Sequence, residues 1–236
     1  MVSPVLFLSA VALGLLSPPA PAPQSARNGA GAWSDKMYQV FTPARFEQFE
    51  PANQHFDFKR LDYPLLHAAI FFATNRARQE NGLEPFRHLP ALEKSATMHA
   101  GDMVELDFFS HANPHEPKRA DAARRMALCG VSNGRRSENI AETFGIQYRS
   151  GAPLIPPDGP PYVFLDYQTR RPIPNHTYNS FAASLLEEWM GSPGHRTNIL
   201  DPEVHYLGCG ARHFLRIQFY YMDCFKAVQN FSSGTR

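Results

Sequence analysis

The stretch WMGSPGHRTNIL at residues 189–200 is the most informative part of the chain, because it joins the end of a helical pattern to a histidine. Apolar side chains recur at three- and four-residue intervals over 179–190, which predicts a helix with one buried face. The sequence SPG at 192–194 then ends that helix and leads into His195. Imidazole is both a metal ligand and a general acid or base at neutral pH, so His195 is a candidate functional residue.

Helical patterns also dominate the chain before this stretch. Asp62 is a suitable N-cap, and Pro64 fits the first helical turn, where its missing N–H has no cost. Apolar residues then recur every three or four positions until Gly82 ends the helix. Further helices are predicted over residues 91–106 and 118–128, and from Ile140 onward.

Strand patterns are concentrated near the C-terminus. Residues 204–212 and 217–225 are rich in β-branched and aromatic side chains, which predicts two strands joined by a turn near Phe214. Seven prolines between 145 and 177 forbid regular helix there, so this segment is expected to be an insertion with a hairpin, in which 162–168 form a strand. Helical patterns in the first part of the chain and strand patterns near its C-terminus indicate an α+β fold.

The length and charge of the chain restrict its class. A chain of 236 residues suits one well-buried domain with extensions, and a net charge of +1 gives no sign of a nucleic-acid partner. Residues 5–16 form an apolar run followed by small residues and prolines, a layout typical of a secretory signal peptide with cleavage near 22–26. No Lys or Arg precedes the run, so an uncleaved anchor is the alternative. We expect export without stable membrane insertion after cleavage.

The three cysteines leave two interpretations open. In an oxidising compartment one disulfide is expected with one thiol left over, and the preferred pair is Cys209 with Cys224, which flank the predicted hairpin. The alternative is that these two and Cys129 are all small buried apolar residues.

Two other segments carry side chains suited to chemistry. His111 follows two aromatic residues, so its ring is expected at the edge of the core. Glu138 opens the sequence ENIA at 138–141, where a carboxylate also suits the first turn of a helix. Each residue alone has an ordinary structural role, including that of His195 as the cap of a chain reversal. Together, imidazoles and a carboxylate are what a metal site or an acid–base pair requires.

Four motifs in this order resemble the CAP superfamily: FSH at 109–111, ENIA at 138–141, WMGSPGHRTNIL at 189–200 and GCG at 208–210. The superfamily, also called the SCP domain, takes in cysteine-rich secretory proteins, insect venom antigen 5 and plant pathogenesis-related proteins. The resemblance extends over about residues 65–225, and the SPGHRTNIL form is similar to the bacterial branch. It implies a three-layer α-β-α sandwich with a mainly antiparallel central sheet and a cleft lined by two histidines and two glutamates.

The resemblance also assigns individual residues to that cleft. His111 matches the first histidine, Glu138 the first glutamate and His195 the second histidine. The second glutamate of animal and plant members falls where this chain has Gly and Ser at 191–192, and Glu188 is the candidate substitute, although adjacent helix positions differ by about 100° in direction. Because some members bind zinc or another divalent ion through their histidines, the resemblance implies His111 and His195 as metal ligands. Water would complete the coordination shell.

By analogy with the superfamily, we expect a protein that is secreted or held in the cell envelope, extracellular or periplasmic. Its cleft is expected to bind a divalent cation or a small ligand in a binding or effector role, with a small molecule, a lipid or a cell-surface component as partner. Two alternatives stay open. One is a metal-assisted hydrolase with Glu138 as its catalytic general base, and the other is a polar network with a structural role only. In either case Arg196 is a candidate partner for a carboxylate near His195, and equally a solvated loop charge.

The expected organisation of the chain follows from these assignments. A signal peptide occupies 1–26, an N-terminal extension 27–60, the CAP/SCP domain 61–228 with the proline-rich insertion at 145–177, and a C-terminal tail 229–236. The extension is rich in aromatic residues without a clear period, and such side chains are costly to leave in water. We therefore expect the extension to pack against the domain.

Overall fold

A four-stranded sheet is the middle layer of residues 33–236, the part of the chain that this computed structural model describes. Its strand order is β1-β5-β6-β2, in which β1 runs parallel to β5 and the other pairs are antiparallel. The bounds of these strands are Arg87–His88 for β1, Arg136–Phe144 for β2, Tyr206–Arg216 for β5 and Met222–Ser232 for β6. Strand β2 therefore lies at one edge of the sheet. The predicted α+β class with a mainly antiparallel sheet is confirmed.

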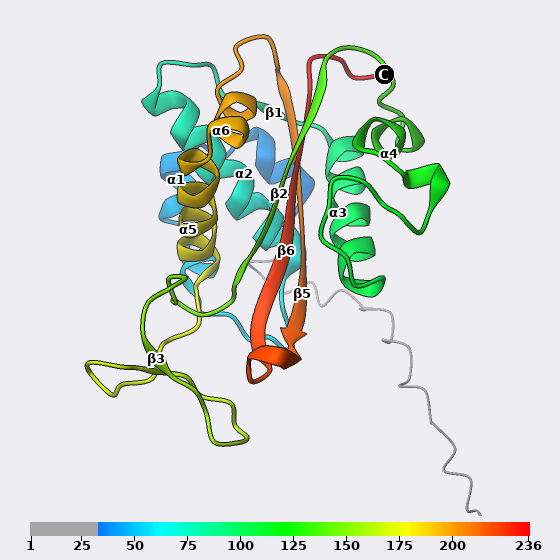
Figure 1. The fold of residues 1–236 in the computed structure, drawn as a ribbon. Helices are drawn as coiled ribbons and strands as arrows, with labels where there is room; N and C mark the ends of the chain where they lie inside the picture. The colour runs from blue at the N-terminus through cyan, green and yellow to red at the C-terminus, as the bar shows by residue number, and fades with distance from the viewer. Residues whose placement is uncertain (1–32) are drawn as a thin grey trace, which may run out of the picture. The chain divides into compact units, whose positions relative to one another are not determined.

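Helices cover both faces of the sheet (Figure 1). On one face lie α3 (Pro90–Glu105) and α4 (Ala122–Leu128); on the other lie α1 (Pro43–Glu47), α2 (Tyr63–Glu80), α5 (Tyr178–Gly191) and α6 (Pro193–Ile199). Four short 3-10 helices span Asp35–Gln39, Glu50–Asn53, Pro117–Arg119 and Ile217–Phe219. Gly208 and Gly210 let α3 lie directly on β5, since a Cβ at either position would overlap the backbone of α3. The arrangement is the three-layer α-β-α sandwich.

The first long helix begins and ends where the sequence predicts. Asp62 Oδ1 accepts a hydrogen bond from the Leu65 N–H at 3.0 Å, and Pro64 lies in the first turn. Gly82 follows the helix with a φ of +72°, a conformation that side chains other than glycine rarely adopt.

The helix predicted from Ile140 onward is wrong, because that residue lies within β2. This strand pairs with β6 over nine positions, from Arg136 opposite Ser232 to Phe144 opposite Cys224. Glu138, Asn139, Ile140 and Ala141 are all buried, so both sides of the strand are covered and the alternation that marks a strand in sequence is missing.

The β5–β6 hairpin is longer than predicted. Phe214 lies inside β5, paired with Cys224, and the chain turns only at Ile217–Phe219, followed by two tyrosines at positive φ. Strand β6 likewise continues to Ser232, so four residues of the predicted tail belong to the sheet. Beyond the predicted turn the ladder continues with Leu215 opposite Asp223 and Arg216 opposite Met222.

The preferred Cys209–Cys224 disulfide is excluded by the register of this hairpin. Cys209 lies opposite Gln229, whereas Cys224 lies opposite Phe214, five residues further along β5. Five strand residues span about 17 Å, far beyond the Cα separation of about 7 Å that a disulfide tolerates. All three cysteines are free, and the two on the hairpin are buried apolar residues, as the alternative interpretation expected.

The described part of the N-terminal extension packs against the domain, as expected. Its aromatic residues Trp33, Tyr38, Phe46 and Phe56 are buried in the main core cluster. Tyr38 also donates a hydrogen bond to Glu93 at 3.0 Å and stacks on the His88 ring. The predicted signal peptide at 1–26 lies outside the described residues. Among residues 33–236, no helix combines the length and apolar character that a membrane span needs.

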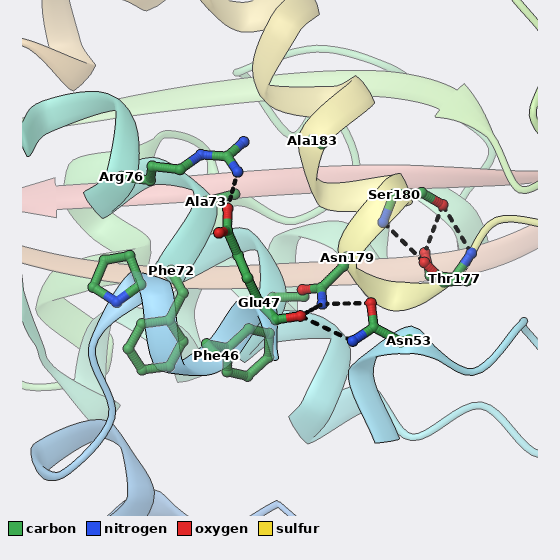
Figure 2. Close-up of a pocket in the computed structure, with 12 residues that line it drawn as sticks. Phe46, Glu47, Asn53, Phe72, Ala73, Arg76, Thr177, Asn179, Ser180 and Ala183 are labelled. Atoms are coloured by element: carbon green, nitrogen blue, oxygen red, sulfur yellow. Dashed lines mark hydrogen bonds and ion pairs between the residues drawn. The ribbon is translucent and has the colours of Figure 1, made fainter. Parts of the chain in front are cut away.

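The extension and helices α2 and α5 enclose a pocket of about 310 Å³ (Figure 2). Asn179 on α5 donates hydrogen bonds to the Glu47 carbonyl and to Asn53, which in turn also donates to the Glu47 carbonyl. Arg76 on α2 pairs with the Glu47 carboxylate. These polar groups satisfy one another, so they attach the extension to the domain and leave no polar group in need of a ligand.

The proline-rich insertion at 145–177 contains a small two-stranded sheet of β3 (Leu154–Ile155) and β4 (Leu165–Asp166), far shorter than the predicted strand at 162–168. Phe164 packs with Ile146, Met222 and Cys224 in a separate apolar cluster. The insertion is therefore anchored on the hairpin end of the sheet, below α5 in the view of Figure 1.

Candidate functional site

His111 and Glu138 meet between the loop after α3 and strand β2. The His111 Nδ1 and Glu138 Oε1 atoms are 3.0 Å apart, and since a carboxylate paired with an arginine only accepts, Nδ1 carries the proton. The His111 side chain is 56% exposed, whereas that of Glu138 is 2% exposed. The buried acid thus orients an accessible imidazole and leaves the Nε2 lone pair free, as in histidines that ligate metals.

Glu138 is held in turn by a buried arginine. Arg125 Nη2 donates to both carboxylate oxygens of Glu138 at 2.9 Å, and the Arg125 side chain is completely buried. Asn230 on β6 donates a further hydrogen bond to Glu138 Oε2 at 3.0 Å when its amide oxygen faces the Ala96 N–H. A general base has to reach the proton that it removes, so this enclosed carboxylate suits an orienting role and does not favour the predicted role of Glu138 as general base.

Arg125 also fixes the loop that carries His111. Its guanidinium donates to the carbonyl oxygens of His111 and Arg119, each at 2.9 Å. Arg119 in turn pairs with Asp102 on α3 at 2.7 Å. The sequence predicts a basic helix here but offers no spacing signal that separates Arg125 from its neighbours, so its role cannot be predicted from the sequence.

His195 lies in the first turns of α6, not in a chain reversal. Asn139, next to Glu138 on β2, donates to the His195 carbonyl at 3.2 Å. Asn198 on α6 donates to Asn139 Oδ1 at 2.8 Å and so ties the two elements together. Burial lowers the pKa of His195, and the charge of His111 lowers it further. His111 and Glu138 are thus in contact, and the backbone of His195 is tied to Asn139, the neighbour of Glu138 on β2.

One prediction about this site is corrected, and for Arg196 the structure agrees with one of the two alternatives, a solvated charge. Glu188 does not join the group, because its carboxylate accepts a hydrogen bond from Thr143 at 2.9 Å, and Thr143 lies five residues, about 17 Å, along β2 from Glu138. Arg196 is exposed and pairs with no carboxylate among residues 33–236, and Arg125 is the arginine of the site. The described residues also contain no group of three or more His, Cys, Asp or Glu side chains placed to hold a metal ion.

The sequence matches a family model and a curated relative. The family model described as "Cysteine-rich secretory protein family" (CAP) matches residues 71–221, well over half of the chain. The uncharacterized protein YkwD of Bacillus subtilis is 26% identical over 137 residues, which are 58% of this chain and 38% of that protein. The chain thus matches less than half of the length of this curated relative.

Solved structures with a similar fold come from Bacillus anthracis and Staphylococcus aureus. An extracellular protein of Bacillus anthracis that contains an SCP domain is 21% identical, with a TM-score of 0.47, and the match covers 81% of this chain and 44% of that one. A cysteine-rich secretory protein of Staphylococcus aureus is 14% identical, with a TM-score of 0.43, over 73% of this chain and 39% of that one.

Proposed function

Because the chain belongs to the cysteine-rich secretory protein (CAP) family, we propose that it is an exported binding protein whose His111 and His195 bind a divalent cation. The observation that carries the proposal is the pair His111–Glu138, in which a buried carboxylate fixes the protonated Nδ1 and leaves Nε2 free to bind an ion. The apolar run at residues 5–16, followed by small residues and prolines, supports export.

The chemistry of the donor groups fits zinc or a similar borderline ion. Neutral imidazole is a good ligand for zinc, copper and nickel. Glu138 accepts the hydrogen bond from His111 Nδ1 that orients the ring. Since two imidazoles would fill only two positions of a tetrahedral ion, the remaining coordination positions would belong to water or to oxygen atoms of a small polar ligand. In such a site the ligand would contact the ion, and Glu138 would contact neither the ion nor the ligand.

The proposal is tested by calorimetric titration of the full chain with zinc chloride. The wild-type protein is expected to bind one zinc ion, and the double variant His111→Ala/His195→Ala to bind it at least tenfold more weakly. The matched control is His115→Ala/His205→Ala, which removes two exposed histidines and is expected to leave the affinity unchanged.

The same titration separates binding from a structural role. If the polar residues form a structural network only, the His111→Ala/His195→Ala variant unfolds more easily but binds zinc as the wild type does. Equal affinity in these two proteins would refute coordination by the two histidines.

A further inference from the structure

A second pocket, of about 510 Å³, lies at the other end of edge strand β2. Its walls include Glu142, Thr143 and Phe144 of β2, Phe109 after α3, Glu188 of α5 and Arg216 of β5. It shares no lining residue with the group of His111, Glu138 and His195. The pocket is therefore lined by a different set of residues, although Phe109 lies two positions before His111 in the chain.

The charges in this pocket do not balance. Arg216 forms an ion pair with Glu142 and also contacts the Cys224 thiol. The charge of Arg216 is therefore neutralised by Glu142. Glu188 accepts a hydrogen bond from Thr143, a neutral group, and among residues 33–236 no Lys, Arg or His lies within ion-pair distance of it. Burial raises the pKa of Glu188, the Thr143 hydrogen bond offsets this only in part, and the charge of Glu187 raises it again. Glu188 is thus an exposed acid of the pocket wall whose carboxylate has a neutral partner only.

Aromatic surface stands beside this acid. Phe109 is 48% exposed although it lines the pocket, and Phe144 forms a further apolar wall. An acid that lacks a cationic partner, next to an aromatic ring, is a combination that recognises an organic cation, because the carboxylate pairs with the charge and the ring attracts it.

We propose that this pocket binds a primary ammonium group on an alkyl chain, with Glu188 as its ion-pair partner and Phe109 against the chain. Two sources share this chemistry, a free alkylamine and a lysine side chain of a peptide. Arg216, held by Glu142, closes the side of the pocket toward the hairpin and disfavours a second positive charge there.

The test uses the full chain and two probes, n-pentylamine and Nα-acetyl-lysine methylamide, titrated calorimetrically and by chemical-shift change. Pentan-1-ol, which has the same chain without the charge, is the control ligand. The wild-type protein is expected to bind at least one amine and not the alcohol. The amine that binds more tightly shows whether the pocket prefers a free alkylamine or a lysine side chain. The His111→Ala/His195→Ala variant is expected to bind the amine as the wild type does, so that this proposal and the metal site succeed or fail separately.

Substitutions at adjacent positions sharpen the test. Glu188→Gln keeps an oxygen for the Thr143 hydrogen bond and removes the charge, so it is expected to weaken amine binding at least tenfold. Glu187→Gln removes the same charge from the next residue, which is 72% exposed and faces Arg149, and is expected to change the affinity less than twofold. Phe109→Ala, at an exposed position, is expected to weaken binding severalfold. Absence of amine binding, or equal binding by wild type and Glu188→Gln, overturns the proposal.

Discussion

Arg125 is the residue on which the geometry of His111 depends most. It donates to both oxygens of Glu138 and to the carbonyl of His111 itself, so one side chain positions both the acid and the loop. A completely buried guanidinium persists only where its charge and its N–H groups find partners. The orientation of the exposed imidazole is therefore set by a residue that no ligand touches.

Replacement of Arg125 is expected to be strongly destabilising. Arg125→Ala leaves the Glu138 carboxylate buried without a cation and should lower the free energy of unfolding by about 3–5 kcal/mol. Arg124→Ala is the control, because that neighbour is 60% exposed, and its effect should stay within about 0.5 kcal/mol. Urea unfolding measures both. A similar, small loss in the two variants would show that the Arg125–Glu138 pair does not hold the site.

The sequence predicts the residues of the site better than their supports. His111, Glu138 and His195 stand in motifs with a fixed order, and the structure joins His111 to Glu138 and the His195 carbonyl to Asn139. Arg125 and Asn139 act through tertiary hydrogen bonds between segments far apart in the chain, for which local spacing carries no signal. Glu188 lies next to the tryptophan of its motif in sequence, but its direction on the helix takes it away from the cleft.

At the level of elements, α2, α3 and α5 are predicted within one or two residues, since each has a clear apolar period and a cap or a proline at its start. Strand β2 is not predicted, because Ser137 and Glu138 resemble the start of a helix. Burial on both faces of the strand also removes the alternation of polar and apolar residues that marks a strand. The turn of the β5–β6 hairpin is predicted too early because strand residues continue beyond Phe214, and only pairing across the hairpin fixes the register.

The short helix α1 makes the N-terminal extension part of the core, although the family match begins only at residue 71. Phe46 is 1% exposed and packs with Trp33 and Phe72, so Phe46→Ala should lower the free energy of unfolding by about 3–5 kcal/mol. Val40→Ala, at a position that is 60% exposed, should change it by less than about 0.5 kcal/mol. Guanidinium unfolding provides the comparison. An extension that is merely attached to the surface would give small changes in both.

On the scale of residues 33–236, three layers meet at the sheet edge formed by β2. Helix α3 lies on one face of the sheet and α6 on the other, with β2 between them (Figure 1). His111 follows α3 in the chain, Glu138 belongs to β2 and His195 to α6. The pocket around Glu188 uses the same edge further along the strand. Edge strands usually need protection from other chains, and here helix side chains provide part of it, since Trp189 and Asn198 donate to the β2 carbonyls of Ile140 and Glu138.

The stability of the whole molecule is expected to fall below neutral pH. Burial, with a smaller effect from the charge of His55, lowers the pKa of His176 from 6.5 to about 4. The unfolded chain therefore takes up this proton first, and stability that is complete above pH 6.5 is lost as the pH falls toward 4, by up to about 3 kcal/mol. Urea unfolding between pH 7 and pH 4 should show a shallower decline for His176→Gln than for the wild type. Parallel declines would contradict this assignment.

Joint binding of one divalent ion by His111 and His195 can be observed by anomalous diffraction at the zinc edge from a crystal soaked in zinc. We predict one dominant peak, about 2.0–2.1 Å from His111 Nε2 and from a ring nitrogen of His195, with Glu138 still bonded to His111 Nδ1. A dominant peak at other side chains, or none near the two imidazoles, would rule out the shared site.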